Sequence, residues 1–469
     1  MRKENIVSTS VVRDDSNLST DRIDWVRGHL GEEATRLLEE DSRYFLHQCL
    51  STPCLNAVKK LEGIYIEDFP GRRYMDFHGN NVHHIGYAHP KLVSALKAQL
   101  DDLVFSPRRY TNRFAVELAH TMVELTGGAL SKCLFAPSGS DAIEIAMRLA
   151  RGVTGRYKTI SFLDSFHGAG FGASGLSGDT LFRDAHLGPF LPGANYVSPP
   201  RFYGGVHEHP DPEGCAKSCI SEINEVFERE GDVGALVACP LVPSEYVPPQ
   251  WFWKEVQQIC RRFGALLVFD EIPYCLGKTG RMFGFEHYEV TPDILVTGKA
   301  LGGGVVPVAC VSTREEFDML GKLAIGHYTH EKNPFLAVAA LATIQIIKEK
   351  GLVEHAASLG ALGLQMASQL KDNHRLVAEV RGKGLVMGIE LSSDAGPQMP
   401  ATAEARQVFY TALEKGLSAK TTGGTLALSP PLIIKREELQ RAFDILDSSL
   451  TDVERESAAS LKRESVESK

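Results

Sequence analysis

The residue best placed to do chemistry is Lys299, which follows a short apolar run and precedes three glycines at 302–304. The run Ile294–Val296 predicts a buried strand. A desolvated lysine loses its proton more readily than one in water, and its amine can then form a Schiff base with a carbonyl group. Glycines nearby let a flat ligand approach the backbone. A solvated lysine in a glycine-rich loop would give the same pattern, so this stretch alone leaves both interpretations open.

A second group of polar residues precedes a helix that we predict over residues 142–151. Gly139 and Ser140 stand at its start, directly after Ser138. Free backbone N–H groups and the helix dipole attract an anion such as phosphate to this position, and serine hydroxyls add further donors. Serine and aspartate also favour such positions as ordinary N-caps, so the motif has a purely structural alternative.

Two more candidates end predicted strands. Asp270 follows the apolar run 265–269, where a carboxylate needs either a cation or water as a partner. A protonated ring nitrogen would suit it. Phe166 follows the strand 159–163 and could stack on a flat ring or pack in the core. A lysine for an aldehyde, a carboxylate for a ring nitrogen, an aromatic ring and an anion site together predict one cofactor, pyridoxal 5'-phosphate.

The elements that carry these residues alternate between short apolar strands and helices from about residue 131 to 300. This alternation predicts an α/β fold with a mostly parallel sheet and helices on both faces. Ligands bind at the carboxyl ends of the strands in such sheets, which is where the candidates fall.

We expect four segments in the chain. An N-terminal arm covers residues 1–75 and packs with a small domain. A large cofactor-binding domain covers residues 76–333, the small C-terminal α+β domain covers 334–450, and a charged tail covers 451–469. We also expect one amphipathic helix over 21–46 and a hairpin over 63–77.

Composition excludes several classes of protein. The net charge of −9 provides no basic excess for a nucleic-acid backbone, so we expect no nucleic-acid partner. No run of about 18 apolar residues occurs, and the first fifteen residues lack an apolar signal core, so we expect no membrane span and no secretion signal. The nine cysteines lack metal-binding spacing and predict reduced thiols in the cytoplasm. The histidines at 83, 84 and 89 more often serve turns than metals, and we expect no metal.

Five motifs in this order resemble the class III aminotransferases. They are Ser-Gly-Ser-Asp-Ala-Ile-Glu at 138–144, Ser-Phe-His-Gly at 165–168, Val-Phe-Asp-Glu at 268–271, the run 278–288 that begins Lys-Thr-Gly-Arg, and the run 291–304 around Lys299. The resemblance extends from about residue 63 to 446. It implies the fold type I of pyridoxal-phosphate-dependent transferases and a homodimer whose active sites are shared between subunits.

The resemblance also implies roles for individual residues. Lys299 corresponds to the Schiff-base lysine and Asp270 to the partner of the pyridinium nitrogen. Phe166 corresponds to the stacking ring, and Gly139 and Ser140 to the phosphate cradle. Thr329 matches a threonine that reaches the phosphate from the neighbouring subunit.

Three positions depart from the family pattern. Cys239 stands where other members have the glutamate of Val-Glu-Pro, and Pro273 stands where they have a glutamine near the cofactor hydroxyl. Ala427 replaces an arginine that binds the α-carboxylate of glutamate or 2-oxoglutarate. A bidentate arginine is hard to replace in carboxylate binding, so the usual amino-acceptor half reaction is not expected here.

The loop 80–86 and the run 44–54 resemble a branch of the family that eliminates rather than transaminates. This resemblance implies a lyase that removes water from 1-hydroxy-2-aminoethylphosphonate and yields phosphonoacetaldehyde and ammonia. Arg109 and Lys332 are the candidate cations for the phosphonate. The alternatives are an O-phosphoethanolamine phospho-lyase, a conventional class III ω-aminotransferase, and an inactive family member with a binding role.

Overall fold

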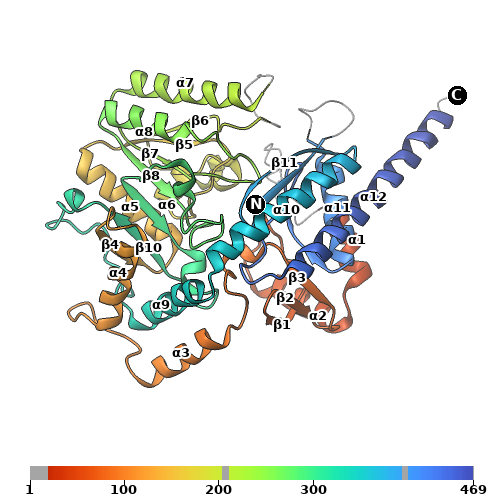
Figure 1. The fold of residues 1–469 in the computed structure, drawn as a ribbon, viewed down its shortest axis with the longest axis horizontal. Coiled ribbons are helices and arrows are strands. Elements are labelled where there is room, and N and C mark those ends of the chain that lie inside the picture. The colour runs from red at the N-terminus through yellow and green to blue at the C-terminus, as the bar shows by residue number, and fades with distance from the viewer. Residues whose placement is uncertain (1–18, 203–210, 393–399, 468–469) are drawn as a thin grey trace, which may run out of the picture.

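A seven-stranded sheet forms the centre of the protein (Figure 1). The computed structural model describes residues 19–202, 211–392 and 400–467. In spatial order the strands are β4 (Lys132–Ala136), β10 (Ala309–Thr313), β9 (Ile294–Thr297), β8 (Leu266–Asp270), β7 (Val233–Ala238), β5 (Lys158–Phe162) and β6 (Ala194–Val197). Within this sheet β10 runs opposite to the other six strands, so it pairs antiparallel with β4 and β9, and all other pairs are parallel. The prediction of a mostly parallel sheet is therefore confirmed.

Helices cover both faces of the central sheet because side chains alternate along its buried strands. On one face, Val237, Val268 and Val296 join a core cluster with the apolar side of α5 (Gly139–Thr154). On the other, Leu267 and Phe269 join the cluster that contains α8 (Phe252–Phe263). The helix α7 (Pro212–Glu230) lies outside, against α8 and β6.

Two smaller sheets complete the fold. The C-terminal sheet has the order β11 (Val377–Lys383), β12 (Val386–Leu391), β15 (Thr425–Leu428) and β14 (Lys420–Thr422). The N-terminal sheet has the order β1 (Val58–Glu62), β2 (Tyr65–Asp68), β3 (Arg73–Asp76) and β13 (Leu417–Ser418). Because β13 pairs with β3, a strand from the C-terminal part of the chain completes the N-terminal sheet. The predicted hairpin over 63–77 is present as β2 and β3, and the four-segment division of the chain stays a prediction.

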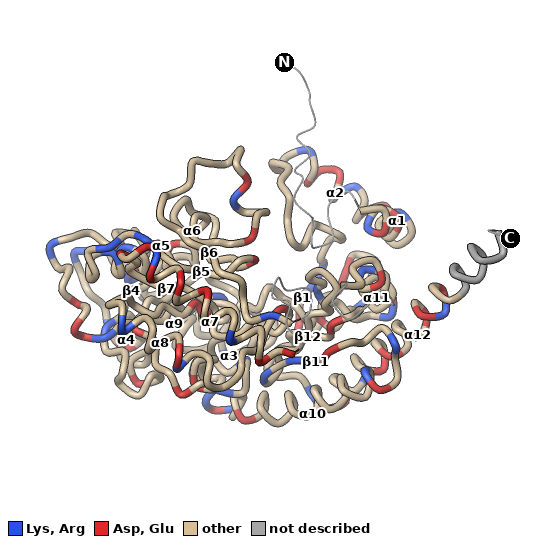
Figure 2. Tube along the Cα trace, turned by 90° about the horizontal axis from the view of Figure 1, so that it is seen from above, with Lys and Arg blue, Asp and Glu red and all other residues tan. Residues whose placement is uncertain are grey.

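The remaining helices flank these sheets. They are α1 (Thr20–His29), α2 (Glu32–Tyr44), α3 (Pro90–Asp101), α4 (Arg113–Leu125), α6 (Phe171–Leu176), α9 (Pro334–Glu349), α10 (Leu352–Asn373), α11 (Thr402–Glu414) and α12 (Arg436–Glu467). None of the helices in the described ranges is long and apolar enough to cross a membrane. Basic and acidic residues are interspersed along the trace in Figure 2.

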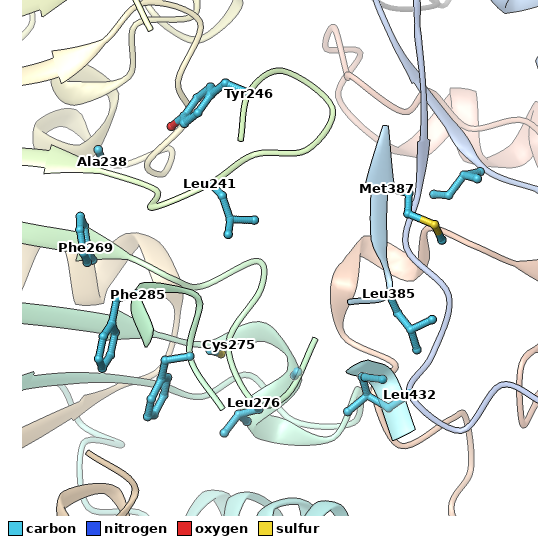
Figure 3. Close-up of a cluster of buried hydrophobic side chains, with 14 of the residues drawn as sticks. Ala238, Leu241, Tyr246, Phe269, Cys275, Leu276, Phe285, Leu385, Met387 and Leu432 are labelled. Atoms are coloured by element: carbon cyan, nitrogen blue, oxygen red, sulfur yellow. The ribbon is translucent and has the colours of Figure 1, made fainter. Parts of the chain in front are cut away.

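A continuous apolar core joins the central sheet to the C-terminal sheet. Figure 3 shows Ala238 and Phe269 from the ends of β7 and β8 on one side, and Leu385, Met387 and Leu432 on the other. All five side chains belong to the same buried cluster. Burial of this shared surface fixes the C-terminal sheet against the carboxyl ends of the central strands.

Several sequence predictions need correction. The single helix expected over 21–46 is two helices, because the chain breaks at Leu30 and Gly31 between α1 and α2. The predicted charged tail is not contradicted: its described residues continue α12 through Glu467, and α12 extends away from the body in Figure 1. The strands β1, β6, β10, β11, β13 and β14 were not predicted. Most of them are short or only partly buried and give a weak periodic signal, whereas β10 is fully buried.

Lys278 forms buried hydrogen bonds within this core. Its side chain is fully buried, and its Nζ donates hydrogen bonds to the carbonyl oxygens of Ser429 at 3.1 Å and Pro430 at 2.6 Å. Burial lowers the pKa of Lys278 to about 7, and Asp76 opposes this shift. The lysine thus ties the loop after β8 to the chain that follows β15.

The substitution Lys278→Met should flatten the pH dependence of stability above pH 7. The folded-state pKa of about 7 lies below the unfolded value near 10.5, so between these values the unfolded chain binds more protons and stability rises with pH. Urea unfolding at pH 7, 8 and 9 measures this slope. Equal slopes in the variant and the wild type would contradict the assignment, and Lys371→Ala, on the exposed end of α10, serves as the control.

Candidate active site

Lys299 lies directly beyond β9, at the carboxyl end of a central parallel strand. Its backbone φ of 43° falls in the left-handed region, which a lysine rarely adopts and which costs free energy. The side chain reaches solvent, yet the surrounding protein desolvates it enough to lower its pKa, while Asp270 acts in the opposite direction. A lysine with a lowered pKa has more of the neutral amine that attacks carbonyl groups.

Asp270 ends β8, the strand next to β9, and pairs in register with Val296. Its carboxylate is buried: Oδ2 lies 2.8 Å from His167 Nδ1, and Oδ1 accepts the amide of Ile272 at 3.1 Å. Because an ionised carboxylate only accepts, His167 donates from Nδ1. Among the described residues no Lys or Arg forms an ion pair with Asp270. A cationic ring nitrogen would supply the partner that such a buried carboxylate requires.

The start of α5 lies beside these residues. Ser138 is the N-cap, and its Oγ accepts the amide of Asp141 at 3.1 Å. Within the described ranges, the amides of Gly139 and Ser140 have no acceptor, as expected for the first turn of a helix. A Cβ at Gly139 would lie 2.8 Å from Cδ1 of Ile272, so this turn lies close to the loop that follows Asp270.

The loop after β5 packs against the same turn. Gly168 has a φ of 128°, and a Cβ there would lie 2.7 Å from Ser140 Oγ, so glycine is needed for both conformation and space. Ser140 Oγ also accepts the amide of Ala169 at 3.1 Å. Phe166 precedes this loop with 46% of its surface exposed, and its ring centroid lies 4.2 Å from that of Phe182. The ring is therefore accessible to a ligand rather than buried in the core.

These features fit pyridoxal phosphate on four separate points: the lowered pKa of Lys299, the buried carboxylate of Asp270, the acceptor-free amides of Gly139 and Ser140, and the exposed ring of Phe166. The sequence-predicted cofactor residues other than Thr329 thus lie around the carboxyl ends of β4, β5, β8 and β9.

Thr329, Lys332 and Arg109 lie on exposed loops instead. The two loops are joined, because Asn112 Nδ2 donates to the Lys332 carbonyl oxygen at 2.8 Å. The ring of Phe105 also meets that of His330 edge-on at 5.5 Å. Within the described part of this single chain, no hydrogen bond, ion pair or ring contact links these three residues to Asp270 or Lys299. Their proposed roles therefore depend on a second subunit.

Sequence reasoning did not assign roles to three residues at the site. His167 could have been found in the Phe-His-Gly motif, because a histidine next to a strand end can reach the neighbouring aspartate. Cys239 contributes a thiol within 4.8 Å of the ligand atoms of His167 and Asp270. Burial raises the pKa of Cys239, which keeps the thiol protonated and disfavours metal binding. Lys420 carries no local sequence signal, since only the folded sheet brings it near Lys299.

The family model of class III aminotransferases matches residues 48–450 of this chain. The chain is 37% identical to the (R)-1-hydroxy-2-aminoethylphosphonate ammonia-lyase of Vibrio splendidus, over 96% of this chain and 95% of that protein. It is 34% identical to the leucine/methionine racemase of Thermococcus litoralis, over 89% of this chain and 96% of that protein.

Solved structures give the same assignment. A Bacillus anthracis aminotransferase superposes with a TM-score of 0.81 at 28% identity, covering 90% of this chain and all of the other. An amine transaminase from an uncultivated Pseudomonas species, in its PLP-bound form, superposes with a TM-score of 0.82 at 27% identity, covering 87% and 99% of the two chains. The fold is the fold type I of pyridoxal-phosphate enzymes, and pyridoxal phosphate is the cofactor. The chain belongs to the class III aminotransferase family.

Proposed function

We propose that this enzyme is a lyase that eliminates water from 1-hydroxy-2-aminoethylphosphonate and yields phosphonoacetaldehyde and ammonia. The observation that carries the proposal is the similarity to the Vibrio splendidus ammonia-lyase over nearly the whole of both chains. Ala427 on β15 supports it, because a methyl side chain cannot bind the carboxylate of an oxo-acid acceptor.

The cofactor, when bound, supplies an aldehyde that captures the substrate amine and a ring that draws electrons from the adjacent carbon. The residues that would hold it are Lys299 at the aldehyde, Asp270 at the ring nitrogen, Phe166 on the ring face, and Gly139 and Ser140 at the phosphate. Asp270 keeps a proton on the ring nitrogen, and His167 keeps the carboxylate oriented through the 2.8 Å contact.

Lys299 moves the proton in the committed step. Its Nζ removes a proton from the substrate carbon that bears nitrogen, and its lowered pKa favours this role as a general base. The hydroxyl of the neighbouring carbon leaves as water by taking up the proton that Lys299 has removed, and the released enamine becomes an imine. Hydrolysis of the imine consumes one water and releases ammonia and the aldehyde, so the net reaction consumes none.

The dimer and the compartment complete the proposal. We infer a homodimer in which Thr329 of each subunit reaches the phosphate site of the other, while Arg109 and Lys332 lie near the same junction. Exposed apolar side chains near these loops support it, namely Leu100, Leu103, Val104, Phe105 and Tyr110.

All nine cysteines are free thiols, which supports the reducing cytoplasm as the compartment in which the enzyme acts. We keep the four segments 1–75, 76–333, 334–450 and 451–469 as the proposed division of the chain.

A panel of amines assayed without any oxo-acid tests the proposed reaction. We expect ammonia and phosphonoacetaldehyde in equal amounts from 1-hydroxy-2-aminoethylphosphonate, with steady turnover and no inorganic phosphate. Phosphate release from O-phosphoethanolamine would select the phospho-lyase instead. Turnover that requires an added oxo-acid would select the ω-aminotransferase.

A further inference from the structure

One row of residues crosses all four strands of the C-terminal sheet. Arg381 on β11 pairs with Gly388 on β12, Gly388 pairs with Ala427 on β15, and Ala427 pairs with Lys420 on β14. Residues directly opposite one another in antiparallel strands project from the same face of a sheet. The Lys420 and Ala427 side chains therefore share the face on which Arg381 and the missing side chain of Gly388 lie.

This face is directed at the loop that follows β7. A Cβ at Gly388 would collide with the Pro243 carbonyl oxygen. Arg381 Nη2 donates to the Ser244 carbonyl oxygen at 2.8 Å. The loop begins at Cys239, whose thiol lies beside His167 and Asp270. The row thus lies over the carboxyl ends of the central strands, where the candidate active site is.

The two cations at the ends of the row differ in their surroundings. Arg381 is balanced by carboxylates, with Glu379 Oε2 at 2.8 Å and Glu390 Oε2 at 2.7 Å. Lys420, half-buried at the other end, acts on Lys299: its charge is one of the influences that lower the pKa of the reacting amine. Lys420 also lowers the pKa of His78, after the larger effect of burial. Since the charge of Lys299 also lowers the pKa of His78, the three side chains lie in the same region of the fold.

We propose that Lys420 is the cation that binds the anionic end of the substrate, on the face of the sheet that it shares with its cross-strand partner Ala427. The inference rests on the proposed function, because it requires a substrate with an amine at one end and an anion at the other. It differs from the sequence-based candidates Arg109 and Lys332, which lie on exposed loops.

The chemistry of this cation suits a phosphonate. A lysine ammonium is a compact point charge with three donors, which can bind a tetrahedral group with three oxygens. A dianionic group beside Lys420 would also offset the repulsion between Lys420 and Lys299 more fully than a carboxylate with a single charge. Lys420 therefore fits substrates that carry a phosphonate or phosphate group.

Substrate and analogue kinetics test the proposal in the cofactor-loaded enzyme. Lys420→Ala should raise KM for 1-hydroxy-2-aminoethylphosphonate roughly 10- to 100-fold, the size expected for the loss of a charged hydrogen bond. It should leave kcat/KM within a few-fold for 1-amino-2-propanol, which has a methyl group in place of the phosphonate. Lys420→Arg should restore most of the affinity. Lys435→Ala, an exposed lysine just before α12, is the matched control and should change neither.

A binding experiment separates this inference from the proposed reaction. Titration with 2-aminoethylphosphonate, which lacks the hydroxyl leaving group, changes the absorbance of the bound cofactor and needs no turnover. Weaker binding to Lys420→Ala supports the anion site even if the wild type releases no ammonia from the hydroxylated substrate. Unchanged binding in Lys420→Ala would overturn it. An equal loss of kcat/KM for 1-amino-2-propanol in Lys420→Ala would also overturn it. So would a Lys420→Arg variant that binds as weakly as Lys420→Ala at an unchanged melting temperature.

Discussion

Replacing Lys299 by alanine is expected to reduce ammonia release by at least about 1,000-fold. The variant lacks both the general base and the amine that bonds to the aldehyde of the cofactor. Lys278 is not available to take over this role, because its Nζ is buried and donates to the carbonyl oxygens of Ser429 and Pro430. The kcat of the purified variant, with ammonia as the measured product, checks this expectation.

The absorbance of the bound cofactor provides the second measurement for Lys299→Ala. We expect the visible band of the wild type to shift or disappear in the variant and to remain in Lys435→Ala. The fold should persist, because the Lys299 side chain is exposed and alanine, which keeps the Cβ, leaves the backbone strain at this position unchanged. A variant that retains more than a tenth of wild-type kcat would refute the assignment. A wild type with no such band would favour the inactive binding protein.

Asp270→Asn is expected to lower kcat by about 100-fold or more, with a smaller change in stability. The amide has nearly the shape of the carboxylate, so it can still accept the amide of Ile272. It lacks the negative charge that keeps a proton on the ring nitrogen, and fixed charges of this kind typically contribute two to three orders of magnitude. The kcat at saturating substrate and the pH dependence of the cofactor absorbance measure the effect.

Asp293→Asn is the matched control for this substitution. Asp293 precedes β9, so it lies at the amino end of this strand, opposite to the end that carries the candidate site. Its Oδ2 accepts the Leu267 amide at 2.8 Å, and its Oδ1 lies 3.3 Å from Arg314 Nε. Its replacement should affect stability but leave kcat within a few-fold. Similar losses of kcat in both variants would show that Asp270 acts through the fold rather than through the cofactor.

The sequence predicts the central sheet well because its strands are buried on both faces. A strand such as β8 is a continuous apolar run that ends at a charged residue, and both features are visible in the sequence. The strand β10 differs: it is equally buried but runs antiparallel between β9 and β4, and its direction depends on pairings that sequence periodicity does not record. The break between α1 and α2 depends on one local turn at Gly31.

The residues of the candidate site likewise fall into two groups, those that the sequence reveals and those that only the fold brings together. Residues at strand ends and at the start of α5 were identified because a local motif marks each of them. His167 and Lys420 were not assigned, because their importance comes from contacts with residues far along the chain. The pairing of Lys420 with Ala427 exists only in the folded C-terminal sheet, and its proximity to Lys299 requires that sheet to be packed on the central one. The roles of Thr329, Arg109 and Lys332 stay predictions.

The shared N-terminal sheet has a consequence for how the chain is made. Met75 on β3 pairs with Leu417 on β13, and Ser429 donates its amide to the Phe77 carbonyl oxygen. The strand β3 therefore leaves the ribosome long before its partner β13 is synthesised. During this interval the edge of β3 that later receives β13 is an unpaired strand edge, which is a recognised route to aggregation. The nascent chain thus depends on shielding of this edge until β13 has been synthesised.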